Sequence, residues 1–135
     1  MILLDTDVII DVALDRQPHA ELGFKLLEQI ESGVELASIA WHTISNLYYI
    51  VRPNHGDITT REFIRELTDF VHVATTDTDA VRYAIQLPMA DFEDALQVAA
   101  ARYCNAEYIV TRNIRDYEHS PIPAMTPKQS LERLA

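Results

Sequence analysis

The sequence has little of several things that would place it in a special class. Among its 135 residues are only three glycines and one cysteine, Cys104. A lone cysteine excludes an intrachain disulfide and has no companion for a zinc site, so we expect a reducing compartment, the cytoplasm. Glycine-rich phosphate loops and nucleophile elbows are absent, and the five histidines show no ligand spacing. These absences argue against disulfide scaffolds, zinc sites and nucleotide-binding loops of the common kinds.

Long apolar runs and positive charge are also scarce. The N-terminal apolar stretch is interrupted by Asp5, Asp7 and Asp11 without a basic segment before it, so we expect neither a signal peptide nor a membrane span. The 11 Lys and Arg against 21 Asp and Glu give a net charge of −10, which argues against non-specific binding to nucleic acid or anionic membranes. A metal ion in an acidic pocket would still admit a nucleic-acid substrate, and the acidity suits a basic protein partner.

Apolar runs of strand length alternate with helical patterns along the whole chain, and 48% of the residues are hydrophobic. We therefore expect one domain, residues 1–135. The alternation predicts a three-layer α/β/α sandwich with a central, mostly parallel sheet of four to five strands. The expected strands are 2–5, 34–38, 71–74, 108–111 and 124–125. The expected helices are 6–14, 20–32, 40–51, 59–70, 77–88, 91–104 and one beginning at 127, with a loop at 54–57.

Acidic side chains follow two of the predicted strands and open one helix. Asp5 ends the first strand, and Asp116 lies in the loop after the strand 108–111, at the carboxyl ends where α/β sheets bind ligands. On the helix 91–104, Asp91 and Asp94 fall on the same flank of the apolar face, and Glu93 falls on the other flank. Carboxylates gathered in one pocket raise each other's pKa, and a hard cation such as Mg²⁺ or Mn²⁺ neutralises them.

Each of these acids also has a purely structural interpretation. Asp5 or Thr6 would serve as the N-cap of the following helix, and Asp91 as the N-cap of the helix 91–104. Glu93 and Asp94 would then be first-turn partners of the helix dipole.

The segment 111–120 carries Thr111, Asn113 and Asp116 together with Arg112 and Arg115. The arginines suit phosphate oxygens, so we expect them to contact the substrate. The structural alternative is a solvated polar loop whose arginines pair with surface acids.

Four segments in this order resemble the PIN-domain family, particularly the VapC-type toxins of toxin–antitoxin pairs. They are MILLDTDVIIDVAL, ASIAWHTISNLYYIVRP, DFEDALQVAAARY and YIVTRNIRDY, and the resemblance covers essentially the whole chain. It implies a ribonuclease dependent on Mg²⁺ or Mn²⁺, with Asp5, Asp94 and Asp116 as catalytic metal ligands. Asn113 matches a position where the family has Asp or Asn, and the resemblance implies that it is a further metal ligand. The resemblance also implies a homodimer and a basic antitoxin partner in the cytoplasm.

The chain departs from the family at one position that matters. Where the family's middle helix usually carries a Glu just before its Leu-Tyr, this chain has Asn46, which brings no charge. Asp7 replaces an Asn that is common in the opening motif. We therefore expect Asp7 or Asp91 to offset the missing charge, with Asn46 and Thr111 supporting the ligands.

The inferred reaction is phosphodiester hydrolysis, and single-stranded RNA is the substrate that best suits a compact acidic pocket. One alternative is a degenerate PIN domain that binds RNA or an antitoxin without cleavage, which Asn46 favours. A second is a phosphatase of the haloacid-dehalogenase type, because Asp5 and Asp7 form a D-x-D motif. That class needs a lysine in the site, and Lys25 and Lys128 are poorly placed for it.

Overall fold

The computed structural model describes all residues 1–135, and its core is one parallel sheet of five strands. The strands are β1 (Ile2–Leu4), β2 (Ala37–Ala40), β3 (His72–Ala74), β4 (Ile109–Val110) and β5 (Ala124–Met125). They lie in the order β3-β2-β1-β4-β5, and every neighbouring pair is parallel. The expected α/β/α sandwich is confirmed.

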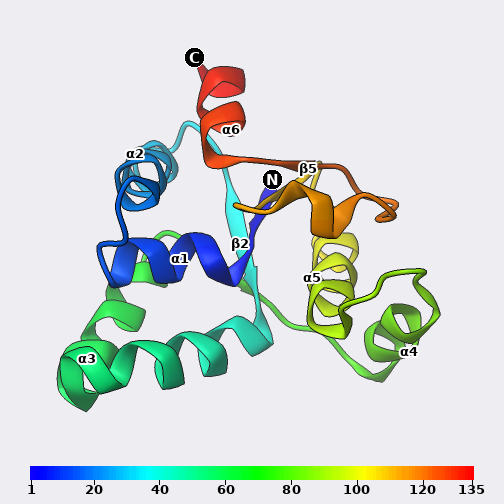
Figure 1. Ribbon diagram of the computed structural model, residues 1–135, viewed down its shortest axis with the longest axis horizontal. Coiled ribbons are helices and arrows are strands. Elements are labelled where there is room, and N and C mark those ends of the chain that lie inside the picture. The colour runs from blue at the N-terminus through cyan, green and yellow to red at the C-terminus, as the bar shows by residue number, and fades with distance from the viewer.

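Helices cover both faces of this sheet (Figure 1). They are α1 (Thr6–Ala13), α2 (His19–Glu31), α3 (Trp41–Leu67), α4 (Thr78–Gln86), α5 (Phe92–Tyr103) and α6 (Pro127–Leu134), with a 3₁₀ turn at Ile114–Tyr117. None of them is long and apolar enough to cross a membrane.

Alternation along β1 explains the two layers. Ile2 and Leu4 pack into a cluster with α1, α2 and α3, whereas Leu3 packs into a second cluster with Val98 and Ala101 of α5. Successive strand residues point to opposite faces, so a three-residue strand buried on both sides must be apolar throughout. The arrangement puts the end of β1 between the helices of the two layers.

Two expected boundaries are wrong. The second strand lies at 37–40 and not at 34–38, because Val34 and Leu36 remain exposed before the chain enters the sheet. The loop expected at 54–57 is a bend within α3 at Gly56, whose φ of 78° leaves the helical region. Glycine adopts this left-handed conformation without steric cost.

Helix caps agree closely with the sequence. Asp77 and Asp91 accept hydrogen bonds from the backbone N–H groups of the third residue after them, Ala80 and Asp94. Pro127 stands at the start of α6 behind a capping box, as expected. The Asp91 cap fixes where α5 begins and therefore which of its first residues face the sheet.

Candidate metal centre

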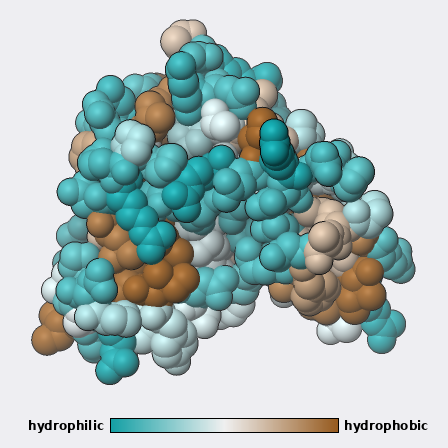
Figure 2. Space-filling model, in the orientation of Figure 1, coloured by the Kyte–Doolittle hydropathy of each residue, from teal (hydrophilic) through white to brown (hydrophobic).

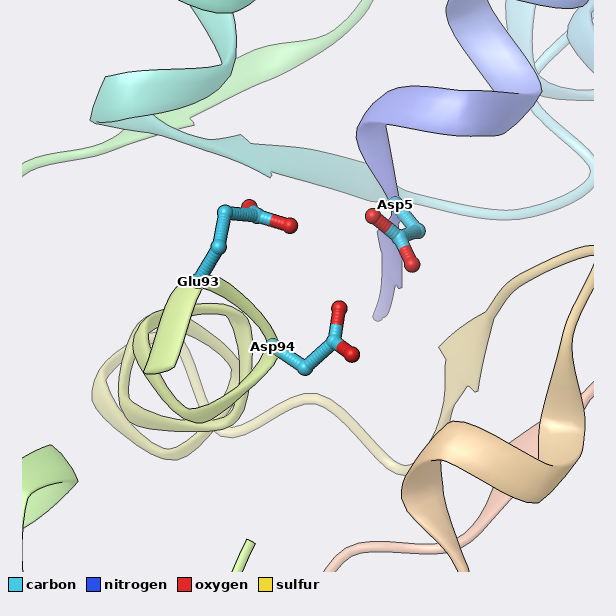
Figure 3. Close-up of side chains that lie close together, drawn as sticks. All are labelled: Asp5, Glu93 and Asp94. Atoms are coloured by element: carbon cyan, nitrogen blue, oxygen red, sulfur yellow. The ribbon is translucent and has the colours of Figure 1, made fainter. Parts of the chain in front are cut away.

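Asp5 lies at the carboxyl end of β1, the central strand of the sheet. Its side chain makes no capping hydrogen bond to α1, so the N-cap interpretation of this side chain is wrong. Its Oδ2 instead accepts hydrogen bonds from the Tyr117 hydroxyl at 2.8 Å and from the Thr111 hydroxyl at 3.0 Å. Asp5 is 5% exposed, and its carboxylate points away from α1 and toward α5 (Figure 3).

The first turn of α5 faces Asp5. Asp91 is exposed and its Oδ1 accepts from the Asp94 backbone N–H at 3.1 Å, so the N-cap interpretation of Asp91 is right. Asp94 is 8% exposed, and its Oδ1 lies 3.4 Å from the Tyr117 hydroxyl that also binds Asp5. A single phenol therefore bridges the two carboxylates, one from the sheet and one from the helix.

Glu93 joins this pair from the other flank of the helix, a role that the sequence did not predict. One carboxylate oxygen from each of Asp5, Glu93 and Asp94 lies within 4.8 Å of the other two. Figure 3 shows Glu93 and Asp94 reaching from adjacent positions of α5 toward Asp5. The two side chains leave the helix about 100° apart, and Asp5 lies in the angle between them.

The three carboxylates differ in their electrostatics. Burial raises the pKa of Asp5, and the charge of Glu93 raises it further. Burial together with the charges of Asp5 and Asp91 raises the pKa of Asp94 to about 7. Burial also opposes ionisation of Glu93, but hydrogen bonds from His42 and Gln97 outweigh it and hold the pKa of that carboxyl below its usual range.

No lysine or arginine forms an ion pair with any of these three carboxylates. The donor set consists of hard oxygen atoms, which Mg²⁺ and Mn²⁺ prefer. Ligand oxygens about 2.1 Å from Mg²⁺ lie roughly 3 to 4 Å from one another in an octahedron. The spacing of the cluster therefore fits such an ion after small side-chain adjustments.

Asp7 lies beside the cluster and forms hydrogen bonds with the residues that follow β4. Its carboxylate accepts from the Thr111 hydroxyl and the Arg112 backbone N–H, each at 3.3 Å. Burial and the nearby charge of Asp5 raise the pKa of Asp7 to about 7. Thr111 is fully buried and donates to both acids, which joins Asp5 and Asp7 through one hydroxyl.

The segment after Thr111 is more open. Asn113, Arg115 and Asp116 are exposed and line a shallow hollow. Asp116 lies near enough that its charge contributes to the raised pKa of Asp94, but it is not one of the three clustered acids. Arg112 is half-buried, with its Nε 3.5 Å from Oδ2 of the buried Asp11 of α1. An acid therefore pairs with this arginine, but it is a buried acid and not a surface one.

Sequence reasoning missed the residues that hold Glu93. His42 Nε2 lies 2.6 Å from Glu93 Oε2, and Gln97 Nε2 donates to the same oxygen at 2.9 Å. The spacing of Glu93 and Gln97, one helical turn apart, was a usable signal. The contribution of His42 was not visible, because it comes from the distant helix α3. Asn46 lies one turn after His42 on that helix and is half-buried.

The sequence matches a known family of protein domains. A family model described as PIN domain matches residues 1–115. No curated protein matches the sequence.

Solved structures with a similar fold come from toxin–antitoxin systems. VapBC2 of Rickettsia felis, bound to promoter DNA, has a TM-score of 0.72 at 17% identity and covers 93% of this chain and 98% of its own. VapBC-1 of nontypeable Haemophilus influenzae has a TM-score of 0.72 at 17% identity, with coverages of 95% and 99%. VapC20 of Mycobacterium tuberculosis, described as a sarcin–ricin loop cleaving toxin, has a TM-score of 0.64 at 14% identity, with coverages of 81% and 87%. At these identities the likeness is one of fold.

Proposed function

The chain belongs to the PIN-domain family, and on this premise we propose that it is a metal-dependent endoribonuclease that cleaves single-stranded RNA as the toxin of a toxin–antitoxin pair. The observation that carries the proposal is the set of three acids, Asp5, Glu93 and Asp94, with which no lysine or arginine forms an ion pair. Buried like charges of this kind oppose folding unless protons or a cation neutralise them. We infer that the cluster is retained because it binds a cation.

The metal chemistry follows from the donor set. Mg²⁺ or Mn²⁺, when bound, polarises the scissile phosphate and lowers the pKa of a coordinated water. Asp5 and Asp94 would hold it, with Asp116 and Asn113 approaching from the open loop. Tyr117 and Thr111 both bind Oδ2 of Asp5 and so orient this carboxylate. Asp7 acts behind this group by fixing the end of β4, and Asp91 acts as the helix cap.

The open loop after β4 suits the substrate. Arg115 is exposed beside Asp116 and would contact a phosphate flanking the scissile bond. Arg112 is engaged with Asp11, so its side chain contributes mainly by holding the loop. An unpaired strand can bend its backbone into such a recess more easily than a duplex can.

A basic antitoxin is the protein partner that this surface favours. Figure 2 shows an apolar patch on the face over α1 and α3. A hollow between these helices and α2 is lined by Val12, Phe24, Leu27, Phe63, Leu67 and Phe70, and acids Glu28, Glu31, Glu66 and Asp69 surround it. Apolar side chains within an acidic rim suit an amphipathic basic segment. Several structural neighbours are themselves toxin–antitoxin complexes, and we propose a homodimer in the cytoplasm by the same family analogy.

The two alternatives stand differently. The phosphatase of the haloacid-dehalogenase type is not supported, because the family is PIN and Asp7 is engaged with Thr111 and Arg112. A degenerate PIN domain that binds without cleavage is still supported by one feature, the neutral Asn46 on α3.

Incubating the protein with unstructured and structured RNAs plus Mn²⁺, beside Asp94→Asn, separates the two remaining functions. We expect the wild type to cleave the unstructured RNA and Asp94→Asn to be inactive. No cleavage by the wild type would favour the degenerate form, and equal cleavage by both proteins would indicate a contaminating nuclease.

A further inference from the structure

The acid that the family usually carries on α3 is absent here, and the structure offers a replacement. We propose that Glu93 of α5 is the third carboxylate ligand of the metal, and that His42 and Gln97 are positioning residues that hold it toward Asp5 and Asp94. This inference rests on the proposed metal-dependent function and adds a ligand that the resemblance does not supply.

The hydrogen bonds of the three carboxylates share one pattern. Asp5 accepts through Oδ2, Glu93 accepts through Oε2 and Asp94 accepts through Oδ1. None of these hydrogen bonds involves the second oxygen of its carboxylate. Each carboxylate is therefore held by one oxygen and offers the other, which is the arrangement that a shared cation requires.

His42 connects α3 to the site through a hydrogen bond to Glu93. Its Nε2 lies 2.6 Å from Glu93 Oε2, and a carboxylate can only accept, so the ring nitrogen is the donor. The helix that lacks the expected acid at Asn46 thus contributes through His42, one turn earlier. It supports a carboxylate from α5 where the family places a carboxylate of α3 itself.

Gln97 makes the second hydrogen bond to Glu93. Its side chain is fully buried, and its Nε2 lies 2.9 Å from Glu93 Oε2 and within 3.2 Å of the hydroxyls of Thr6 and Thr43. The carboxylate fixes the amide orientation, because an amide oxygen in that place would repel it. The Gln97 Oε1 is then left buried with no donor.

The amide nitrogen of Gln97, and not its oxygen, faces Glu93, so Gln97 is placed to hold this carboxylate. Thr6 and Thr43 bond each other at 2.8 Å beneath the amide, which joins α1, α3 and α5 at this point. Glu93 is therefore held by side chains of α3 and α5, and Thr6 of α1 supports it indirectly through Gln97.

Calorimetric titration of Mn²⁺ into the metal-free protein tests the ligand. Glu93→Gln should weaken Mn²⁺ binding by about tenfold or more. Asp91→Asn is the matched control, because it removes one charge from the same turn of α5 and keeps a side chain that caps the helix. It should change the affinity by less than about threefold, the effect of a screened charge. The melting temperature of each metal-free variant shows that it is folded.

The outcomes separate this inference from the proposed function. If Glu93→Gln binds Mn²⁺ as tightly as Asp91→Asn while Asp94→Asn loses binding, Glu93 is not a ligand and the metal site stands without it. If the wild type binds no Mn²⁺, or Asp94→Asn binds it equally well, both proposals are wrong.

Two substitutions of His42 test the positioning role. His42→Ala should lower the Mn²⁺ affinity by about tenfold, whereas His42→Gln should restore most of it, because its amide N–H reaches about as far as the ring Nε2. Equal, weak binding by both variants would contradict positioning through this hydrogen bond. Wild-type binding by both would contradict any role of His42 toward the metal.

Discussion

The two sides of Asp5 are built differently. On the α5 side, Glu93 and Asp94 are held by side chains from α3, α5 and the 3₁₀ turn, and Thr6 of α1 supports them through Gln97. On the β4 side, Asn113, Arg115 and Asp116 are exposed on a short loop. Under the proposed function, the α5 side, which we call the rigid side, would define where a metal sits, whereas the open β4 side could adjust to a substrate.

The largest contrast should appear between acids of the two sides. Asp5→Asn removes a ligand that both sides share and should reduce RNA cleavage by about 10³-fold or more. Asp116→Asn changes an exposed acid near the cluster and should reduce cleavage by about 10- to 100-fold, with a smaller change in Mn²⁺ affinity. Single-turnover cleavage assays measure both effects. Equal losses of activity and affinity in the two variants would remove the distinction between the sides.

Next in size is the stability effect at the base of the open loop. Arg112→Ala leaves the buried Asp11 without its half-buried partner, and an unpaired buried acid of this kind costs about 1–3 kcal/mol. Urea denaturation should therefore show a lower free energy of unfolding. Arg115→Ala is the matched control, because the side chain is exposed, and it should change that free energy by less than about 0.5 kcal/mol. A stable Arg112→Ala variant would show that Asp11 does not depend on the pair.

The pH dependence of stability probes the rigid side directly. In the folded chain the pKa of Asp94 and that of Asp7 are both raised to about 7, mainly by burial, against about 3.9 when unfolded. The folded state then binds these protons more tightly, so their stabilising contribution is complete below about pH 4 and is lost as the pH rises to about 7. The metal-free protein should accordingly melt at a lower temperature at pH 8 than at pH 5.

Asp94→Asn should reduce that pH dependence, because the amide has no proton to lose. Thermal denaturation of the two proteins across this pH range makes the comparison. Identical slopes would mean that Asp94 ionises as easily in the folded protein as in the unfolded chain.

The smallest effect is expected at Arg115. Arg115→Ala should weaken RNA binding only a few-fold at low salt and reduce the slope of log affinity against log salt by about one unit or less. Its Mn²⁺ affinity should stay at the wild-type value. Binding titrations at several salt concentrations, with Mn²⁺ replaced by Ca²⁺ if cleavage interferes, provide the measurement. A loss of metal affinity would make Arg115 part of the rigid side.

The sequence was sufficient for the architecture and for part of the site. Alternating apolar runs predicted the parallel sheet, and the position of Asp5 after β1 predicted where its carboxylate lies. The strand β2 was misplaced because Val34 and Leu36 are apolar yet exposed, and apolarity alone cannot show where a chain enters a sheet.

Glu93 was missed for a different reason. A helical wheel sorts the residues of one helix by direction, but it does not show what stands opposite. Glu93 reaches the cluster because Asp5 lies between its direction and that of Asp94, and because His42 holds it from another helix. Contacts between segments so distant in the sequence have no local signature.

Thermal denaturation with and without Mn²⁺ at pH 7.5, on the wild type and Asp94→Asn, tests the central claim most directly. The claim is that the clustered carboxylates form a metal site, so Mn²⁺ should raise the melting temperature of the wild type, because a ligand that binds only the folded state stabilises it. It should raise that of Asp94→Asn much less, although this variant should be the more stable of the two without metal. An equal rise in both proteins, or none in the wild type, would contradict the account.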